Sequence, residues 1–282
     1  MSAGSEGTTG SGPSGTPGDG EATTGASSGG PEIHPESTGE GDDPSTGEGS
    51  SGDPSDASGD ASGDGMGSSS GGMDSTLLFY EPFDGGMNNT WPAPWVPLGG
   101  LIAYDVTGDG RGRLLGHATT VGRVGVPGFT ELDVDLSLTV TFEDWAGQGM
   151  GAYVRQNGGW LVETMPPGAG YAIYIEGHGD PAMGVWREVQ GVETLVASVD
   201  LPGVVDNVPY RVRVQCEQVG GSTVVRGRLW PAANPEPATW LLEYTDNAPT
   251  LQNVAGSIAL DVYNYDGSNS VYFDDVELHS LP

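Results

Sequence analysis

The chain has 282 residues, in which 39 Asp and Glu stand against nine basic residues, all of them Arg, so the formal net charge is −30. So negative a chain repels nucleic acid and anionic lipid surfaces, which excludes both as partners bound through charge. No apolar stretch reaches the ~18 residues that a transmembrane helix needs.

The composition changes abruptly near residue 75. Residues 1–75 contain no aromatic residue and no Arg, and Ile33 is their one large aliphatic side chain, whereas every Trp, Tyr and Phe lies beyond them. Such a stretch cannot bury enough apolar surface to offset the entropy lost on ordering. We therefore expect residues 1–75 to be a disordered, acidic tether rich in Gly, Ser and Thr, and residues 76–282 to be one folded domain.

The start of the chain bears on its location. No signal peptide is visible after Met1. Many bacterial surface lipoproteins carry a spacer of this composition between their lipid-bearing cysteine and a β-domain. We therefore expect an extracellular or cell-surface protein whose leader, and a lipid anchor, are encoded upstream of this start. A cytoplasmic protein or another export route is the alternative.

Alternation of apolar and polar residues with a period of two dominates residues 76–282. Strands are expected over 77–83, 94–104, 111–126, 132–142, 149–155, 159–165, 170–176, 183–189, 192–199, 208–217, 222–230, 239–245, 255–265 and 270–279. Turn signals rich in Gly and Pro separate them, such as Gly108-Asp109-Gly110 and Asp266-Gly267. So many short strands predict an all-β fold of two packed antiparallel sheets.

The single cysteine, Cys216, excludes an intramolecular disulfide. It alternates with Tyr210, Val212 and Val214, which places it on the inward face of its strand. A thiol in an apolar core is not readily ionised, so we expect an unreactive, buried Cys216. The tryptophans beside prolines or strand ends are expected to pack in the same way: Trp91, Trp95, Trp230 and Trp240.

Several segments resemble the concanavalin A-like lectin/glucanase superfamily, in the laminin-G-like jelly-roll branch of bacterial secreted or surface proteins. They are Phe83-Asp-Gly85 with Trp91-Pro-Ala-Pro-Trp95, Gly151-Ala-Tyr-Val-Arg155, the segment 185–195, Tyr210-Arg-Val-Arg-Val214, Arg228-Leu-Trp230 with Pro235-Glu-Pro237, and Val271-Tyr-Phe-Asp-Asp-Val276. The resemblance implies a two-sheet jelly-roll sandwich with a concave face that often holds carbohydrate. Lectins, binding modules, glycosidases and adhesion domains share this fold, so the fold does not settle the function.

Glu131, Asp133 and Asp135 resemble the Glu-x-Asp-x-Glu run of the laminarinase-type glycosidases in this superfamily, with a shorter third carboxylate. On one strand, a period of two would place all three on the same face, where a retaining mechanism needs its two main carboxyls ~5–5.5 Å apart. The alternative is a solvent-facing acidic strand edge. The flanking residues favour that alternative, because they lack the aromatics expected around a sugar subsite.

The superfamily also implies a metal site. Its carbohydrate-binding jelly rolls often pair the first and last strands, and acidic residues from both bind a structural Ca²⁺, which prefers hard oxygen ligands. The matching candidates in this chain are Glu81, Asp84, Asp274 and Asp275. An ordinary solvated strand edge is the alternative.

Strand parity predicts which side chains leave the core and face a ligand. If the aliphatic residues of the central strands point inward, the outward set is Tyr153, Arg155, Tyr174, Glu176, Trp186, Asp261 and Tyr263. Aromatic rings mixed with charged groups suit sugars, which offer an apolar ring face and hydroxyls. The alternative is that these aromatics fill gaps under loops or between the sheets. A cover formed by residues 160–170 would weaken the sugar-binding hypothesis.

The first hypothesis for function is therefore a non-catalytic, surface-displayed or secreted module that binds glycan or polysaccharide on a flexible tether. The second is an atypical glycoside hydrolase that uses the carboxylates above, or Glu163 with Glu176. The third is a structural envelope or adhesion domain without a small ligand.

Overall fold

The computed structural model describes residues 75–85, 90–201 and 203–282. Apart from Ser75, the predicted tether over 1–75 lies outside the described residues. No helix among the described residues is long and apolar enough to cross a membrane.

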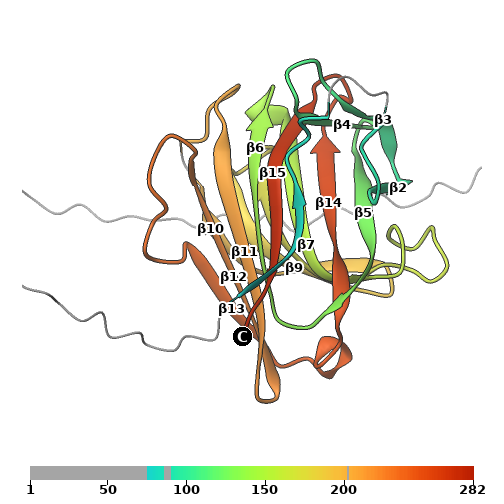
Figure 1. The fold of residues 1–282 in the computed structure, drawn as a ribbon, viewed down its shortest axis with the longest axis vertical. Coiled ribbons are helices and arrows are strands. Elements are labelled where there is room, and N and C mark those ends of the chain that lie inside the picture. Colours follow the sequence, from blue (N-terminus) through green and yellow to red (C-terminus); the bar gives the residue numbers. More distant parts are fainter. Residues whose placement is uncertain (1–74, 86–89, 202) are drawn as a thin grey trace, which may run out of the picture. The chain divides into compact units, whose positions relative to one another are not determined.

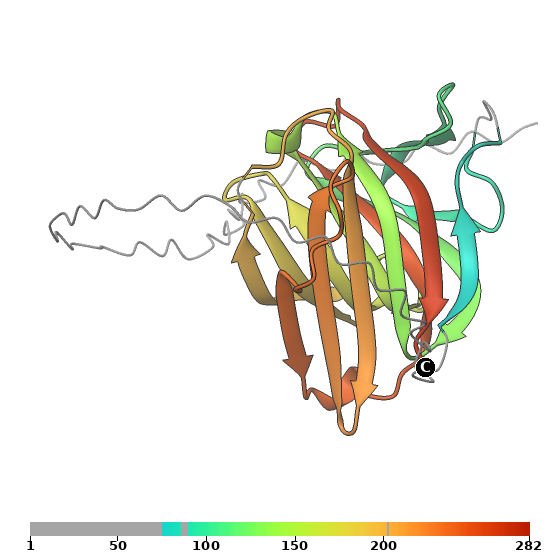
Figure 2. The same ribbon diagram turned by 60° about the vertical axis from the view of Figure 1, so that its left-hand side comes forward.

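The described residues form two antiparallel sheets, which face each other as two layers (Figures 1 and 2). The eight-stranded sheet runs in the order β13(Leu242–Asp246), β12(Ser222–Pro231), β11(Tyr210–Val219), β6(Val134–Phe142), β15(Val271–Ser280), β4(Gly112–Gly116), β3(Leu101–Val106), with β1(Thr76–Glu81) paired to β15. The seven-stranded sheet runs β10(Val192–Asp200), β9(Ala182–Val189), β8(Ala169–Glu176), β7(Gln148–Asn157), β14(Gly256–Asn264), β5(Thr120–Glu131), β2(Val96–Gly99). Two 3-10 turns, η1(Trp145–Gly147) and η2(Pro249–Leu251), complete the described elements.

This architecture confirms the predicted all-β jelly-roll sandwich, and its core lies between the sheets. In β11 the alternation is strict: Tyr210, Val212, Val214 and Cys216 are buried, and the residues between them are half-exposed. Burial raises the pKa of Cys216 to about 12, so the thiol stays protonated at neutral pH. The prediction of a buried, unreactive cysteine is confirmed in its burial and in the direction of this shift.

Aromatic residues close one end of the sandwich, where β1 pairs with β15. Trp91 packs edge-on against Phe83, Trp95 and Phe273, with ring centroids 4.6, 5.1 and 5.8 Å apart. The Trp91 Nε1 donates a hydrogen bond to the carbonyl of Asp105 at 2.9 Å, which satisfies its one polar atom. The packing role predicted for Trp91 and Trp95 is confirmed.

The strand predicted over 159–165 is wrong, because this segment is a loop. Gly158 has a φ of 72°, which turns the chain away from β7. The Thr164 hydroxyl then accepts a hydrogen bond from the Trp160 backbone N–H at 2.8 Å, and Pro166 and its neighbour Pro167 have no N–H to offer a sheet. The segment 159–165, whose alternation predicted a strand, is therefore held by hydrogen bonds within the loop.

Candidate functional site

The outer face of the seven-stranded sheet carries a row of one large and two small residues. Tyr174 of β8 stands between Gly151 of β7 and Gly184 of β9 in the strand register. A Cβ added to Gly151 would lie 2.6 Å from a Tyr174 ring carbon, so the glycine leaves the space in which the ring lies. The missing side chains let an aromatic ring lie against the sheet instead of standing away from it.

In the neighbouring row of the same face, a tyrosine again lies between two small residues, which here are alanines. Tyr153 of β7 lies between Ala259 of β14 and Ala172 of β8, and Ala172 in turn separates it from Trp186 of β9. Tyr153, Ala172 and Ala259 are fully buried and form a small apolar cluster of their own, against which Trp186 packs. The outer face of this sheet is therefore a second packed layer, distinct from the core between the sheets.

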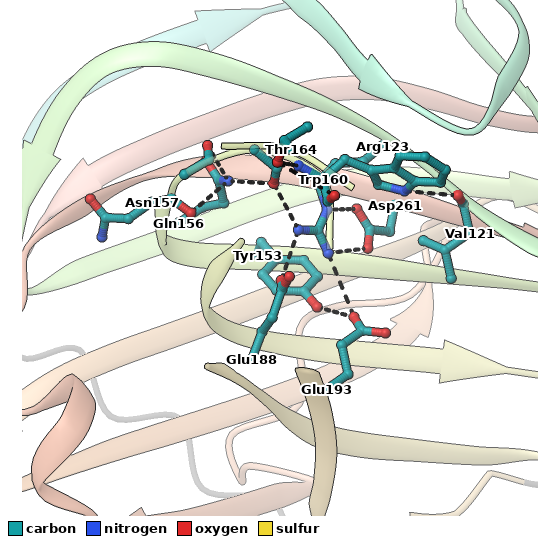
Figure 3. Close-up of polar contacts among 12 residues, drawn as sticks. Val121, Arg123, Tyr153, Gln156, Asn157, Trp160, Thr164, Glu188, Glu193 and Asp261 are labelled. Carbon is teal, nitrogen blue, oxygen red and sulfur yellow. Dashed lines mark hydrogen bonds and ion pairs between the residues drawn. The ribbon is translucent and has the colours of Figure 1, made fainter. Parts of the chain in front are cut away.

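Arg123 of β5 lies fully buried on this face among three carboxylates (Figure 3). Its Nε and Nη2 donate to the two oxygens of Asp261 at 2.6 and 2.8 Å, and its Nη1 donates to Glu188 Oε2 at 2.7 Å. Glu193 Oε1 lies 3.5 Å from Nη2 and accepts a hydrogen bond from the Tyr153 hydroxyl. The guanidinium carbon is 4.1 Å from the centroid of the Tyr153 ring. We call these five residues the Arg123 cluster.

The Arg123 cluster contains one cation and three acids, and burial makes the excess negative charge costly. Burial raises the pKa of Asp261 to about 7 against the opposing pull of Arg123, and the neighbouring glutamates add to the rise. Burial likewise raises the pKa of Glu188, whose Oε1 is buried without a hydrogen-bond partner among the described residues. The cluster therefore holds a proton more readily than exposed carboxylates do.

The loop 158–168 closes the Arg123 end of the outer face (Figure 3). The Gly159 carbonyl accepts a hydrogen bond from Arg123 Nη1 at 3.3 Å. Trp160 donates from Nε1 to the Val121 carbonyl at 3.1 Å, and its ring lies against Gly99. The cover that would weaken the sugar-binding hypothesis thus exists, but it lies over one end of the face.

At the other end the same face remains hollow. A hollow of about 170 Å³, which we call the aromatic hollow, is lined by Val121, Tyr174, Glu176, Trp186, Glu193 and Tyr263. The rings of Tyr174 and Trp186 meet edge to face with centroids 6.3 Å apart. Beside the hollow, His178 stacks on Tyr265 at 4.4 Å and lies 6.0 Å from Tyr263. Aromatic surface and carboxylates therefore meet at one small concavity.

Tyr174 and Glu176 give this hollow its chemical character. Tyr174 is 7% exposed, and its hydroxyl is buried without a hydrogen-bond partner among the described residues. Burial raises the pKa of Tyr174 well above its usual range, so the hydroxyl keeps its proton and remains a donor. Burial also raises the pKa of Glu176, with His178 opposing the rise. Both groups are polar, desolvated and without a strong protein partner in the described structure.

Apart from Arg155, the predicted ligand-facing residues fall into two groups in the structure, those that line the aromatic hollow and those that are buried in the Arg123 cluster. Tyr174, Glu176, Trp186 and Tyr263 line the aromatic hollow. The two outward residues Tyr153 and Asp261 are fully buried within the Arg123 cluster. Their part in binding a ligand stays a prediction, but Tyr174 and Trp186 do not lie between the sheets.

The outward direction predicted for Arg155 is wrong. The register between β7 and β8 shifts between Val154 and Asn157, and Arg155 itself has a φ of 51°, so the strand contains a bulge there. The bulge reverses the parity and turns Arg155 toward the opposite sheet. Its Nε donates to the Leu132 carbonyl at 2.6 Å, and its Nη1 donates to Thr223 Oγ1 at 2.9 Å.

The one-strand arrangement predicted for the three catalytic candidates is also wrong. Glu131 ends β5 of the seven-stranded sheet, Asp135 belongs to β6 of the eight-stranded sheet, and Asp133 lies in the bend between them. Asp135 accepts hydrogen bonds from Nε and Nη2 of Arg213 at 2.8 and 2.7 Å. The chain changes sheets within this run, so a period of two cannot hold the three carboxylates on one face.

The four calcium candidates lie where β1 meets β15, as the resemblance implies for the first and last strands. Glu81 Oε1 accepts a hydrogen bond from the backbone N–H of Phe83, and an oxygen of Asp275 accepts one from the Tyr80 hydroxyl. Burial raises the pKa of Glu81 and of Asp274, and Asp84 adds to both. No group of three or more His, Cys, Asp or Glu in the described part of the chain is arranged to hold a metal ion. Side chains alone therefore do not fit a calcium site, and calcium stays a prediction.

Sequence reasoning missed Arg123, Glu188 and Glu193 as parts of one cluster. The one available signal was the charge of Arg123 within the apolar run from Val121 to Val126. Its partners lie 65 to 138 residues away in sequence. Their meeting depends on strand order, which one sequence does not state.

The fold of the described residues is similar to that of solved jelly-roll sandwiches. A protein of unknown function with a galectin-like fold from Bacillus subtilis superposes with a TM-score of 0.53 at 13% identity, covering 73% of this chain and 96% of that one. The carbohydrate-binding module CBM66 from Bacillus subtilis gives 0.48 at 15% identity over 68% and 98% of the two chains. The β-glucanase from Bacillus licheniformis gives 0.49 at 12% identity over 72% and 97%. No family model and no curated protein matches the sequence.

Proposed function

We propose that the domain is a non-catalytic module that binds glycan, with one sugar ring seated in the aromatic hollow. The observation that carries the proposal is the meeting of three aromatic rings with two carboxylates at one small concavity. An aromatic ring can pack on the apolar face of a sugar, while carboxylates and a phenol bond its hydroxyls.

The side chains that line the aromatic hollow are held in place by their neighbours, which supports the proposal. The Tyr174 ring fills the space that Gly151 leaves open, and Glu193 accepts a hydrogen bond from the Tyr153 hydroxyl. Side chains that are already ordered lose little entropy when a ligand binds, so more of the contact energy appears as affinity.

The test is binding on an array of neutral and charged glycans, followed by titration calorimetry with the best ligand. Trp186→Ala removes an aromatic wall of the hollow, and we expect at least about tenfold weaker binding, or about 1.4 kcal/mol. Trp240→Ala is the matched control, because Trp240 lies over Arg228 of β12, in the other sheet. Equal affinity for the two variants, or no ligand on the array, would contradict the proposal.

We further propose that the module works outside the cell or at the bacterial surface, with residues 1–75 as its tether and a lipid anchor upstream. The composition of residues 1–75 supports this placement. A hydrophobic segment ending in a small residue and Cys, just upstream in the same reading frame, is expected. Its absence from the gene would favour a cytoplasmic protein or another route of export.

Structural calcium is a separate proposal for Glu81, Asp84, Asp274 and Asp275, where backbone carbonyls would have to complete the shell. Calcium bound to the folded state alone must stabilise it, so millimolar calcium is expected to raise the melting temperature. An unchanged melting temperature over that range would end the proposal.

A further inference from the structure

The charge of the aromatic hollow points to a narrower class of ligand. Of the described residues that line it, two are acidic, Glu176 and Glu193, and none is basic. Three aromatic rings complete the wall, and the faces of aromatic rings attract cations. Each of these features favours a positively charged group and disfavours an anionic sugar.

The cation beneath the hollow cannot offset this charge. Arg123 is 0% exposed, and its nitrogens are engaged by Asp261, Glu188 and the Gly159 carbonyl. Three acids surround that one guanidinium. If more than one of them is ionised, the Arg123 cluster carries a net negative charge beneath the aromatic hollow. In a poorly hydrated concavity such a charge acts strongly on whatever enters.

Glu176 has one basic neighbour beside the hollow and no arginine partner in the described structure. His178 is the basic side chain that stands next to Glu176, and it stacks on Tyr265, which is 55% exposed. Glu176 makes no ion pair with an arginine in the described structure. A cationic ligand would supply a strong partner for this half-buried carboxylate.

The volume of the hollow sets the size of the group. Pockets for drug-sized ligands span about 300–1,000 Å³, and the hollow has about 170 Å³. It therefore suits one sugar unit or one pendant group of a longer chain. The hollow does not extend along several sugar units on the described face.

We propose that the aromatic hollow selects glycans with free, protonated amino groups, such as polysaccharides containing unacetylated amino sugars. The ammonium lies between Glu176 and Glu193 against the rings of Trp186 and Tyr263. This inference rests on the proposed function, because it names the sugar class for the same hollow.

The experiment is titration calorimetry of the full chain with a β-1,4-linked glucosamine tetramer and with the same tetramer fully N-acetylated, at pH 6 and physiological salt. The amine tetramer is expected to bind at least about tenfold more tightly. Glu176→Gln keeps the shape of the side chain and removes its charge, so the preference should fall severalfold. Asp200→Asn is the matched control, because it removes one exposed charge from β10 and should leave the preference unchanged.

Attraction of a cationic sugar to the acidic residues 1–75 favours the amine tetramer in every variant, so it cancels only between variants. The comparison of Glu176→Gln with Asp200→Asn therefore decides whether the hollow causes the preference. Equal affinity for the two tetramers, or an equal loss in Glu176→Gln and Asp200→Asn, would overturn the inference and leave glycan binding intact. Failure of both tetramers and of every glycan on the array would instead overturn the proposed function itself. A preference lost in Glu176→Gln and kept in Asp200→Asn supports both.

Discussion

The two ends of the outer face of the seven-stranded sheet share the strands β5, β9, β10 and β14, and they differ in how their polar groups are used. At the Arg123 end, charged groups bind one another and the loop 158–168 covers them. At the Trp186 end, a hydroxyl and two carboxylates remain around a hollow. One end uses its polar groups to build structure, and the other holds the polar groups that we propose for binding a ligand.

The two ends of the outer face are also connected through one residue. Glu193 belongs to both ends, because it accepts a hydrogen bond from Tyr153 in the cluster and lines the aromatic hollow. The cluster therefore fixes one wall of the hollow. Changes at the covered end should act mainly on stability, and changes at the open end mainly on binding.

The strongest effect is expected from Arg123→Met, which leaves the buried carboxylates of Asp261 and Glu188, and the half-buried one of Glu193, without their cation. Breaking a buried ion pair by removing one partner costs about 3–5 kcal/mol, and we expect a loss of this size in the free energy of unfolding. Urea denaturation measures it. The matched control is Arg211→Met, because Arg211 is half-buried and donates to the hydroxyls of Ser137 and Thr139.

A loss below about 1 kcal/mol for Arg123→Met, equal to that of Arg211→Met, would mean that the covered end is not held together by its charges. The contrast between the two ends would then lose its physical basis.

The second effect is a fall in stability as the pH rises. The pKa of Asp261 is about 7 in the folded protein, because burial raises it, and lies near 4 in the unfolded chain. The folded state therefore binds more protons, and its advantage is lost as the pH rises through about 7. We expect roughly 1–3 kcal/mol less stability at pH 8 than at pH 5.

Denaturation midpoints at pH 5, 6, 7 and 8 check this direction. Asp261→Asn should flatten the dependence, because it removes the titrating acid and keeps an oxygen acceptor for Arg123. A stability that rises from pH 5 to pH 8, with the same slope in the variant, would show that Asp261 stays ionised throughout.

The weakest effect is expected from Trp160→Ala, which removes the ring that lies against Gly99 and the hydrogen bond to the Val121 carbonyl. We expect about 1–2 kcal/mol of destabilisation, together with faster proteolysis within residues 158–168. Val162→Ala changes an exposed side chain of the same loop and serves as control. If Trp160→Ala leaves the cleavage rate unchanged, the tryptophan does not anchor the cover.

The features that could be predicted from the sequence are those that depend on the alternation of side chains along a regular strand. The alternation in β11 identified Cys216 as buried, and the aliphatic half of β6 was placed correctly from Val134 to Phe142. Parity also placed Tyr174 and Trp186 outside the inter-sheet core. Each of these inferences needs only a regular strand with one buried face.

Prediction failed where the regular strand ended. A single bulge reversed Arg155, and a change of sheet between β5 and β6 separated Glu131 from Asp135. Local side-chain bonds made a loop of 159–165. A bulge shifts the alternation by one residue, which moves a side chain to the other face of the sheet. A corner or a loop ends the alternation altogether.

The order of the amino acids was enough to establish an acidic, all-β chain with an aliphatic interior and a buried thiol, because hydrophobic alternation is a local property that any single strand displays. The folded structure was needed to establish which strands stand side by side, and so to bring Arg123 to Asp261 and Tyr174 between two glycines. Pairing across a sheet joins residues far apart in the chain. The covered cluster and the open hollow exist only once that pairing is made.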